Sequence, residues 1–179
     1  MISNLSKVLY IFFCGIFFAL LQASYFFLLQ MSLSSAYITY FTVVLAWLCG
    51  SWLGLRIALI HKEIHLAFLA MVSVYLLYIL TGIFPFQMNF LPLYILLVIS
   101  SSLYAGYFFK AQRQAFIQVK YLFIWETLGF IFGLIFSFLG FILFGKRLIL
   151  FGPLLTFFLV FVFFKFKGYV TAYDRKNKK

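Results

Sequence analysis

Glu126 is the residue whose type and position most invite a chemical role, because it is an acid within a long apolar stretch. A charged side chain at the centre of a bilayer costs about 2.5–3.5 kcal/mol on insertion scales, so such residues are usually functional. Glu126 lies near the start of its stretch, where Arg56, Arg113 or Lys120 are candidate partners. The open interpretations are an ion pair or hydrogen bond near the membrane interface, a proton- or cation-coupling role, and contact with a partner protein.

Gln22 and the serines Ser100, Ser101 and Ser102 are further polar side chains within apolar stretches. An amide or hydroxyl without a partner in hydrocarbon costs several kcal/mol, so we expect hydrogen bonds between helices. A polar position on a transport path is the alternative. Glu126, Gln22 and Ser101 together form the candidate polar site within the membrane.

His61, Glu63 and His65 form an H-x-E-x-H cluster that is a candidate metal site. The zinc-protease motif instead has Glu directly after the first His, and this cluster lacks a clear third ligand, so we expect neither a metal nor another cofactor.

Cys14 and Cys49 are predicted to be small buried packing residues rather than a redox pair. No His, Cys or paired carboxylates converge within the apolar stretches, which argues against an enzyme.

The composition places these residues in a membrane. Of the 179 residues 66% are hydrophobic and 9% charged, with a mean hydropathy of +1.14, whereas a soluble domain has about a quarter of its residues charged. A membrane-crossing helix needs about 20 apolar residues. Six stretches qualify, near Val8–Gln30, Tyr37–Leu59, Leu66–Phe84, Leu91–Phe109, Tyr121–Phe144 and Leu148–Phe166. The short breaks predict an all-α bundle of six transmembrane helices, formed by residues 1–166, with a basic tail at 167–179.

The basic residues predict the orientation of the helices. The chain has 14 Lys and Arg against 3 Asp and Glu, a net charge of +11. With six spans, all basic residues except Lys146 and Arg147 fall on the side of the two termini. Cytoplasmic loops collect Lys and Arg, so both termini are predicted to be cytoplasmic. The tail is expected to attract anionic lipid, at about 1 kcal/mol per basic residue near the surface, and not nucleic acid; the residues concerned are Lys165, Lys167, Arg175 and Lys176.

Small residues recur at helical spacing in three of the predicted spans. Membrane helices associate mainly through close packing and polar contacts, so these stripes are predicted to be packing faces that meet one another. The alternative is that the glycines allow hinging around a substrate path. The stripes are Gly15, Ala19 and Gln22 in the first span, Ala46, Gly50 and Gly54 in the second, and Glu126, Gly129, Gly133, Ser137 and Gly140 in the fifth.

Four segments carry a resemblance to a known family. In order and spacing, Cys14–Gln22, Leu45–Gly54, Ser102–Phe108 and Tyr121–Gly133 resemble spans of the membrane domain fused to many bacterial spermidine synthase-like proteins. The sequence departs from that family, which usually has an acid in place of Gln22 and commonly Asn in place of Glu126. No segment resembles the soluble synthase domain. The resemblance implies a six-helix bundle like half of a major-facilitator transporter, in the bacterial cytoplasmic membrane.

These observations favour a non-enzymatic integral membrane subunit or scaffold that assembles with another protein or with itself. The alternative is a half-size major-facilitator-like transporter of a small solute that works as a dimer.

Overall fold

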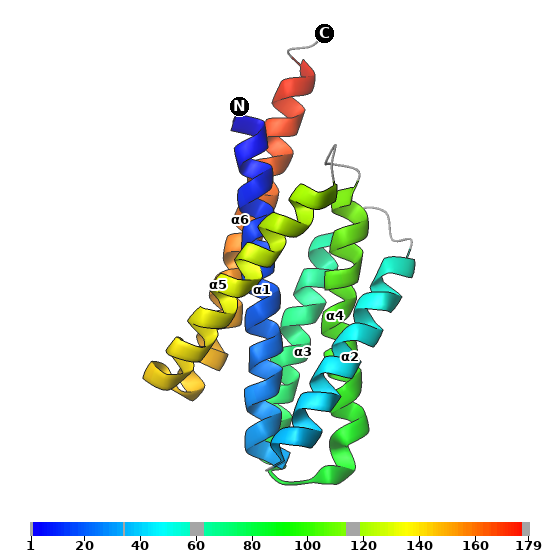
Figure 1. Cartoon of the computed structure of the whole chain (residues 1–179), viewed down its shortest axis with the longest axis vertical. Coiled ribbons are helices and arrows are strands. Elements are labelled where there is room, and N and C mark those ends of the chain that lie inside the picture. The colour runs from blue at the N-terminus through cyan, green and yellow to red at the C-terminus, as the bar shows by residue number, and fades with distance from the viewer. Residues whose placement is uncertain (1, 34, 58–62, 114–118, 177–179) are drawn as a thin grey trace. The chain divides into compact units, whose positions relative to one another are not determined.

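The computed structural model describes residues 2–33, 35–57, 63–113 and 119–176, which are almost entirely helical (Figure 1). No strand occurs in these ranges, so the predicted all-α class is confirmed. A short 3-10 helix, η1 (Met88–Phe90), leads into the fourth long helix. The long helices are α1 (Ile2–Leu33), α2 (Ala36–Arg56), α3 (Glu63–Ile83), α4 (Leu91–Arg113), α5 (Val119–Phe144) and α6 (Lys146–Lys176).

Each of the long helices is long and apolar enough to cross a membrane. Their candidate spans contain 21 to 29 residues with hydropathies from 1.6 to 2.4, and at 1.5 Å per residue about 20 residues cover the hydrocarbon core. The predicted number of six is therefore confirmed for the described part of the chain. The helix ends differ from the prediction, because α1 begins before Val8 and α6 continues past Phe166 to Lys176. The basic tail thus begins as a continuation of α6.

The turns between helices follow local backbone chemistry. Between α5 and α6 the chain reverses at Gly145, which has a φ of 55° and whose N–H donates to the carbonyl of Phe141 at 2.8 Å. This left-handed conformation after a helix is the one that glycine adopts without strain. Ser35 caps α2, since its side chain accepts from the backbone N–H of Ile38. Phe86, after α3, has a φ of 62°, which is unusual for a bulky residue.

The chain divides into two compact units, and the boundary falls within α1. The contiguous unit comprises Leu21–Ala115 and contains the C-terminal part of α1 with α2, α3 and α4. The discontinuous unit comprises Met1–Leu20 and Phe116–Lys179 and contains the N-terminal part of α1 with α5 and α6.

The contiguous unit is organised around α4, which packs against both α2 and α3 (Figure 1). Small residues on α3, Ala67 and Ala70, are completely buried, as is Val98 on α4. Small side chains let membrane helices approach closely and gain dispersion contacts, which replace the hydrophobic effect that lipid does not provide. The core of this unit therefore depends on close contact of α4 with α2 and α3.

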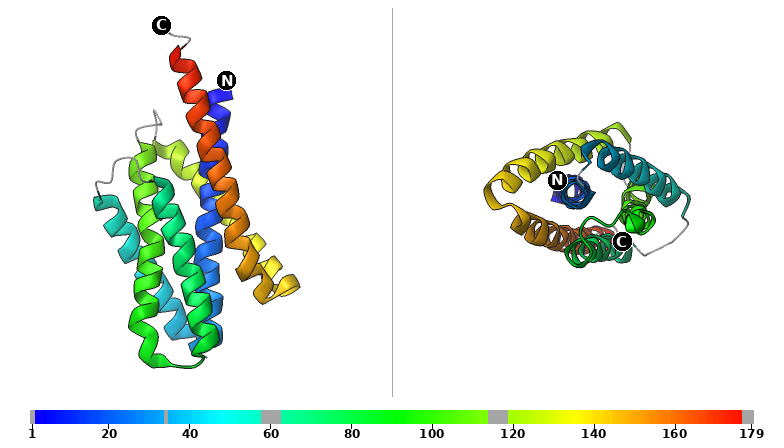
Figure 2. Two further views of the ribbon diagram at one scale, coloured as in Figure 1. Left: turned by 180° about the vertical axis from the view of Figure 1, so that it is seen from behind. Right: turned by 90° about the horizontal axis from the view of Figure 1, so that it is seen from below.

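In the discontinuous unit α5 and α6 form an antiparallel hairpin, and the N-terminal part of α1 lies between them (Figure 2). Aromatic rings connect α1 to α6 along its length. Such tilted or offset pairs contribute about 0.5–1.5 kcal/mol each beyond the area they bury. The pairs and their centroid distances are Tyr10–Phe164 at 6.0 Å, Phe13–Phe163 at 4.7 Å and Phe17–Phe157 at 6.1 Å.

The outer surface of α5 is strongly apolar. Its buried residues are mostly small, such as Gly129 and Ser137, whereas Phe132 is 59% exposed and Ile142 is 77% exposed. Large apolar side chains outside and small residues inside reverse the pattern of a soluble protein. Such a surface is stable in hydrocarbon and would aggregate in water.

Candidate functional site

Small residues bring α1 and α5 into direct backbone contact. A side chain at Gly15 would collide with the backbone carbonyl of Glu126, and one at Gly133 would place its Cβ 2.7 Å from the Cβ of Ala19. Gly129 is equally enclosed, against the backbone of α1. Only glycine fits at such close approach. The structure therefore brings together the small-residue stripes that the sequence predicted on these two helices.

The stripe on α2 packs against α4, a helix on which the sequence predicted no such stripe. A Cβ at Gly54 would lie 3.0 Å from the carbonyl carbon of Leu103, and one at Gly50 would meet the backbone of the same helix. Ala46, on the same face of α2, is 4% exposed. The residue that sequence reasoning missed is Gly106, which lies against the backbone of α2 in return. Its four-residue spacing from Ser102 was the available indication.

A chain of hydroxyl contacts connects three helices of the contiguous unit. The hydroxyl oxygen of Tyr25 on α1 lies 2.6 Å from Ser101 Oγ on α4 and 3.0 Å from the carbonyl oxygen of Leu97. Ser101 Oγ lies 2.8 Å from the carbonyl oxygen of Ala70 on α3. Each hydroxyl has one proton, so these two side chains can fill two of the three contacts at a time.

The distances favour one arrangement of the two protons. When Tyr25 donates to Ser101 and Ser101 donates to Ala70, only the longest contact, 3.0 Å to Leu97, is left without a proton. If Tyr25 instead donated to Leu97, either the 2.6 Å contact between Tyr25 and Ser101 or the 2.8 Å contact between Ser101 and Ala70 would have no proton between its two oxygen atoms. We call this ordered pair of bonds the hydroxyl relay, and it ties α1, α4 and α3 together.

Other hydroxyls in the helices bond to their own backbone. Ser100 Oγ donates to the carbonyl of Leu96 at 2.8 Å, and Ser137 Oγ donates to the carbonyl of Gly133 at 2.7 Å. Such bonds to the preceding turn satisfy a hydroxyl where water is absent. Ser32, Ser73, Thr81, Ser102 and Thr156 do the same.

The predicted polar site is divided between the two units. Gln22 and Ser101 belong to the contiguous unit, where Gln22 is half-buried one turn before Tyr25 and is not part of the hydroxyl relay. Glu126 belongs to the discontinuous unit and is half-buried on α5. Tyr25 was missed by sequence reasoning, because one tyrosine among many aromatic residues has no distinguishing pattern.

Two of the three cations that the sequence offered as partners of Glu126 have aromatic neighbours. Lys120 Nζ, which lies in the same unit as Glu126, is 5.2 Å from the ring centroid of Tyr121. The guanidinium carbon of Arg56 lies 3.9 Å from the ring centroid of Trp52. Cations over aromatic faces are stabilised by the ring quadrupole. Within the described residues of its own unit, Glu126 has no ion pair.

Polar side chains form hydrogen bonds between helices at the end of the contiguous unit where α4 ends. Gln112, which is 2% exposed, donates through Nε2 to Glu63 Oε1 at 2.8 Å. Lys110 Nζ donates to the carbonyl of Ile57, at the end of α2, at 2.9 Å. Cations at a helix C-terminus satisfy its last carbonyls and complement the helix dipole. These bonds join α3 and α2 to the C-terminal end of α4.

The remaining candidate residues are the H-x-E-x-H cluster and the two cysteines. His61 lies outside the described residues, and among those that are described there is no group of three or more His, Cys, Asp or Glu that could hold a metal. Both cysteines are free thiols. Cys14 is buried as expected, but Cys49 is exposed, so the prediction of a buried packing residue was wrong there. Cys49 faces outward because the small-residue face of α2, one position away at Gly50, is the face that packs.

The basic tail is described only in part. Lys165 is exposed, and its Nζ lies 5.6 Å from the ring centroid of Phe161. The side chains of Lys167, Arg175 and Lys176 lie outside the described residues. The lipid contact expected for this cluster stays a prediction.

Comparisons with protein-family models, curated proteins and solved structures found no significant match to this chain.

Proposed function

We propose that this chain is a non-enzymatic integral membrane subunit or scaffold of the bacterial cytoplasmic membrane, crossing the bilayer six times with both termini inside. The observation that carries the proposal is how the helices use their polar side chains. The hydroxyl relay joins three helices, and seven other serine and threonine hydroxyls among the described residues donate to backbone carbonyls of their own helices. Polar groups used in this way stabilise a helix assembly and do not present reactive atoms to a substrate.

The outer surface and the charge distribution support membrane insertion with this orientation. Large apolar side chains are exposed on every helix, which suits lipid as the surrounding solvent. In the order of the helices, Arg56, Lys110 and Lys165 fall at the same ends of their spans as the N-terminus. Basic residues concentrate on the cytoplasmic side, so that end is the cytoplasmic one.

A protein partner is proposed to contact the outer face of α5. Only 22% of the residues in its span are buried, against 33–67% for the other five helices. Glu126 lies on this same helix and has no ion pair within the described residues of its unit. The side chain of Thr127 already offers a hydrogen bond to its carboxyl, and an acid in a span is further stabilised by a cation. A neighbouring chain packed on α5 would provide one and cover the remaining apolar face.

Site-specific photocross-linking in native membranes tests the partner. A benzophenone analogue of phenylalanine replaces Phe132 on α5, which is 59% exposed, or Phe68 on α3, which is 55% exposed and serves as the matched control. We expect a discrete protein adduct at position 132 and lipid adducts alone at position 68. Lipid adducts alone at both positions would refute assembly through α5, and an adduct of twice the chain mass would identify the partner as a second copy.

A half-size transporter working as a dimer is the second candidate, and Glu126 is the observation that favours it. Purified chain in liposomes with an imposed pH gradient and an internal pH-sensitive dye tests this function. The scaffold proposal predicts proton flux equal to that of empty liposomes. Flux that is above this level and is abolished by Glu126→Gln would instead support proton-coupled transport, whereas flux unaffected by Glu126→Gln would remove Glu126 from the mechanism.

A further inference from the structure

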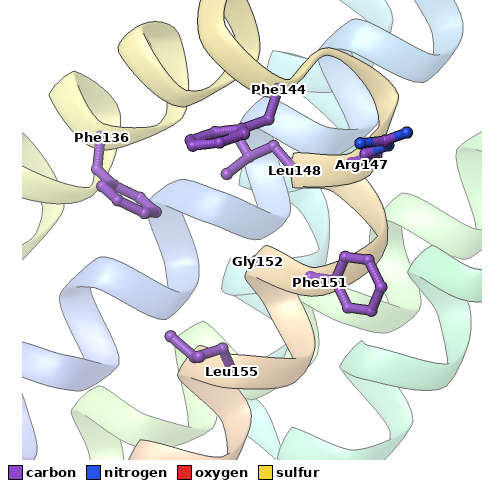
Figure 3. Close-up of a pocket in the computed structure, with 7 residues that line it drawn as sticks. All are labelled: Phe136, Phe144, Arg147, Leu148, Phe151, Gly152 and Leu155. Carbon is purple, nitrogen blue, oxygen red and sulfur yellow. The ribbon is translucent and has the colours of Figure 1, made fainter.

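A groove of about 280 Å³ lies on the α5–α6 hairpin near its turn (Figure 3). Phe136 and Phe144 of α5 line one side, and Phe151 and Leu155 of α6 contribute further walls. The one charged residue among those lining it is Arg147, in the first turn of α6, which contributes only its aliphatic atoms, so that its guanidinium lies outside the groove. We call this site the hairpin groove. Its volume suits part of one hydrocarbon chain, since it is just below the range of about 300–1,000 Å³ that holds a whole small molecule.

The position of Arg147 is not explained by orientation or by helix stability. Apart from Lys146 and Arg147, the basic residues of the sequence fall toward the other ends of the spans. Both residues are exposed in the first turn of α6, where the positive end of the helix dipole disfavours a cation. A cation kept in an unfavourable place beside an apolar groove indicates an anionic ligand with an apolar part.

We propose that the hairpin groove binds one acyl chain of a membrane phospholipid whose anionic headgroup pairs with Arg147. A guanidinium binds phosphate oxygens through two parallel hydrogen bonds, which fixes the headgroup as well as attracting it. The aromatic and aliphatic walls begin within three residues of Arg147 in the sequence, at Phe144 and Leu148, so one molecule can contact both the walls and the guanidinium. The proposal rests on the membrane insertion proposed above, because lipid reaches the groove only from a bilayer.

This site is distinct from the lipid contact expected for the basic tail. The tail lies at the C-terminal end of α6 and the hairpin groove at its N-terminal end, so in a membrane they face opposite leaflets. The tail offers a cluster of charges, whereas the hairpin groove offers an apolar surface with one cation beside it. A cluster of charges attracts anionic lipids without selecting a single molecule.

Native mass spectrometry of the full chain tests the headgroup part of the proposal. The chain is released from micelles that contain equal amounts of phosphatidylglycerol, which is anionic, and phosphatidylcholine, which is zwitterionic. We expect one retained phosphatidylglycerol, and Arg147→Gln should lower its retention about tenfold through the loss of a charge-assisted pair. Lys146→Gln removes the same charge one residue away and should change retention by less than about twofold. Equal losses in the two variants would overturn the site in favour of diffuse attraction.

Two tryptophan substitutions test the apolar part. Leu155→Trp puts extra bulk into the hairpin groove, whereas Leu154→Trp puts it on the neighbouring exposed position outside the lining. We expect the phosphatidylglycerol adduct to be lost with the first and kept with the second; retention in both would overturn the proposal. Carbonate washing of membranes separates this result from failure of the proposed function: a chain that is extracted by carbonate refutes membrane insertion itself, and one that resists extraction does not.

Discussion

Replacement of Tyr25 by Phe is expected to destabilise the chain by about 1 kcal/mol. The side chain is completely buried, and the substitution keeps its shape while removing the donor of the 2.6 Å bond to Ser101. Ser101 keeps its own bond to the carbonyl of Ala70, so no buried donor is left without a partner. The loss is then that of one hydrogen bond between membrane helices, which averages about 0.6 kcal/mol and reaches about 1.7 kcal/mol. Because the distance of 2.6 Å is short, we expect this bond to contribute more than the average, about 1 kcal/mol.

Tyr94 provides a matched control within the same unit. It is 1% exposed, and in the described structure its hydroxyl is a buried polar atom with no hydrogen-bond partner. A buried hydroxyl without a partner costs free energy, so Tyr94→Phe is expected to be neutral or to stabilise the chain by up to about 1 kcal/mol. The two substitutions remove the same atom from equally buried rings and differ only in what that atom contacts.

Equilibrium unfolding in mixed micelles by increasing dodecyl sulfate measures both effects, with tryptophan fluorescence as the reporter. Trp47, which is 9% exposed on α2, lies in the same unit as both tyrosines. Combining Tyr25→Phe with Ser101→Ala should give a coupling energy close to the cost of Tyr25→Phe alone. The order of bonds in the hydroxyl relay is refuted when Tyr25→Phe has no effect on the free energy of unfolding, or when Tyr94→Phe costs as much.

Three further predictions concern backbone conformation, each measured by the same unfolding assay. Gly106→Ala should destabilise the chain by about 2 kcal/mol, because the added Cβ would collide with the backbone of Ser51. Gly82→Ala is the control: Gly82 is also in a helix, but a Cβ there would have no atom within 4 Å, so this substitution should stabilise the chain by about 0.5 kcal/mol. Equal effects of the two substitutions would contradict the packing of α2 against α4. Gly145→Ala should cost about 1 kcal/mol, because φ is 55° there; no cost would mean that the turn has another conformation. Phe86→Asn should stabilise by about 0.5 kcal/mol, since Asn tolerates a φ of 62° better, and a loss of stability would show that the exposed ring has a role of its own.

The helices could be predicted from the sequence because apolar length alone determines whether a helix can cross a membrane. Every backbone group in hydrocarbon must be satisfied within its own helix, so hydropathy indicates secondary structure directly. Helix ends were less predictable. The sixth span was predicted to end at Phe166, whereas α6 continues to Lys176, because beyond the hydrocarbon a helix ends according to capping and propensity rather than hydropathy.

The packing face of a helix was easier to predict than the helix against which that face packs. Gly50 and Gly54 indicated a packing face on α2, but their partner depends on the backbone path of α4 around Gly106, which no spacing within α2 encodes. The polar site shows the same limit. The cost of a charge in lipid singled out Glu126, while Tyr25 became recognisable only when folding placed its hydroxyl beside Ser101.

The division of α1 between the two units has a consequence for how the protein is made. Residues Leu21–Ala115 are contiguous, so this unit can assemble while the ribosome is still synthesising the rest of the chain. The other unit joins a segment that is translated before this contiguous unit, Met1–Leu20, with one that is translated after it, Phe116–Lys179. Under the membrane insertion proposed above, the glycine and aromatic faces on the first half of α1 therefore lack their packing partners until α5 and α6 have been inserted.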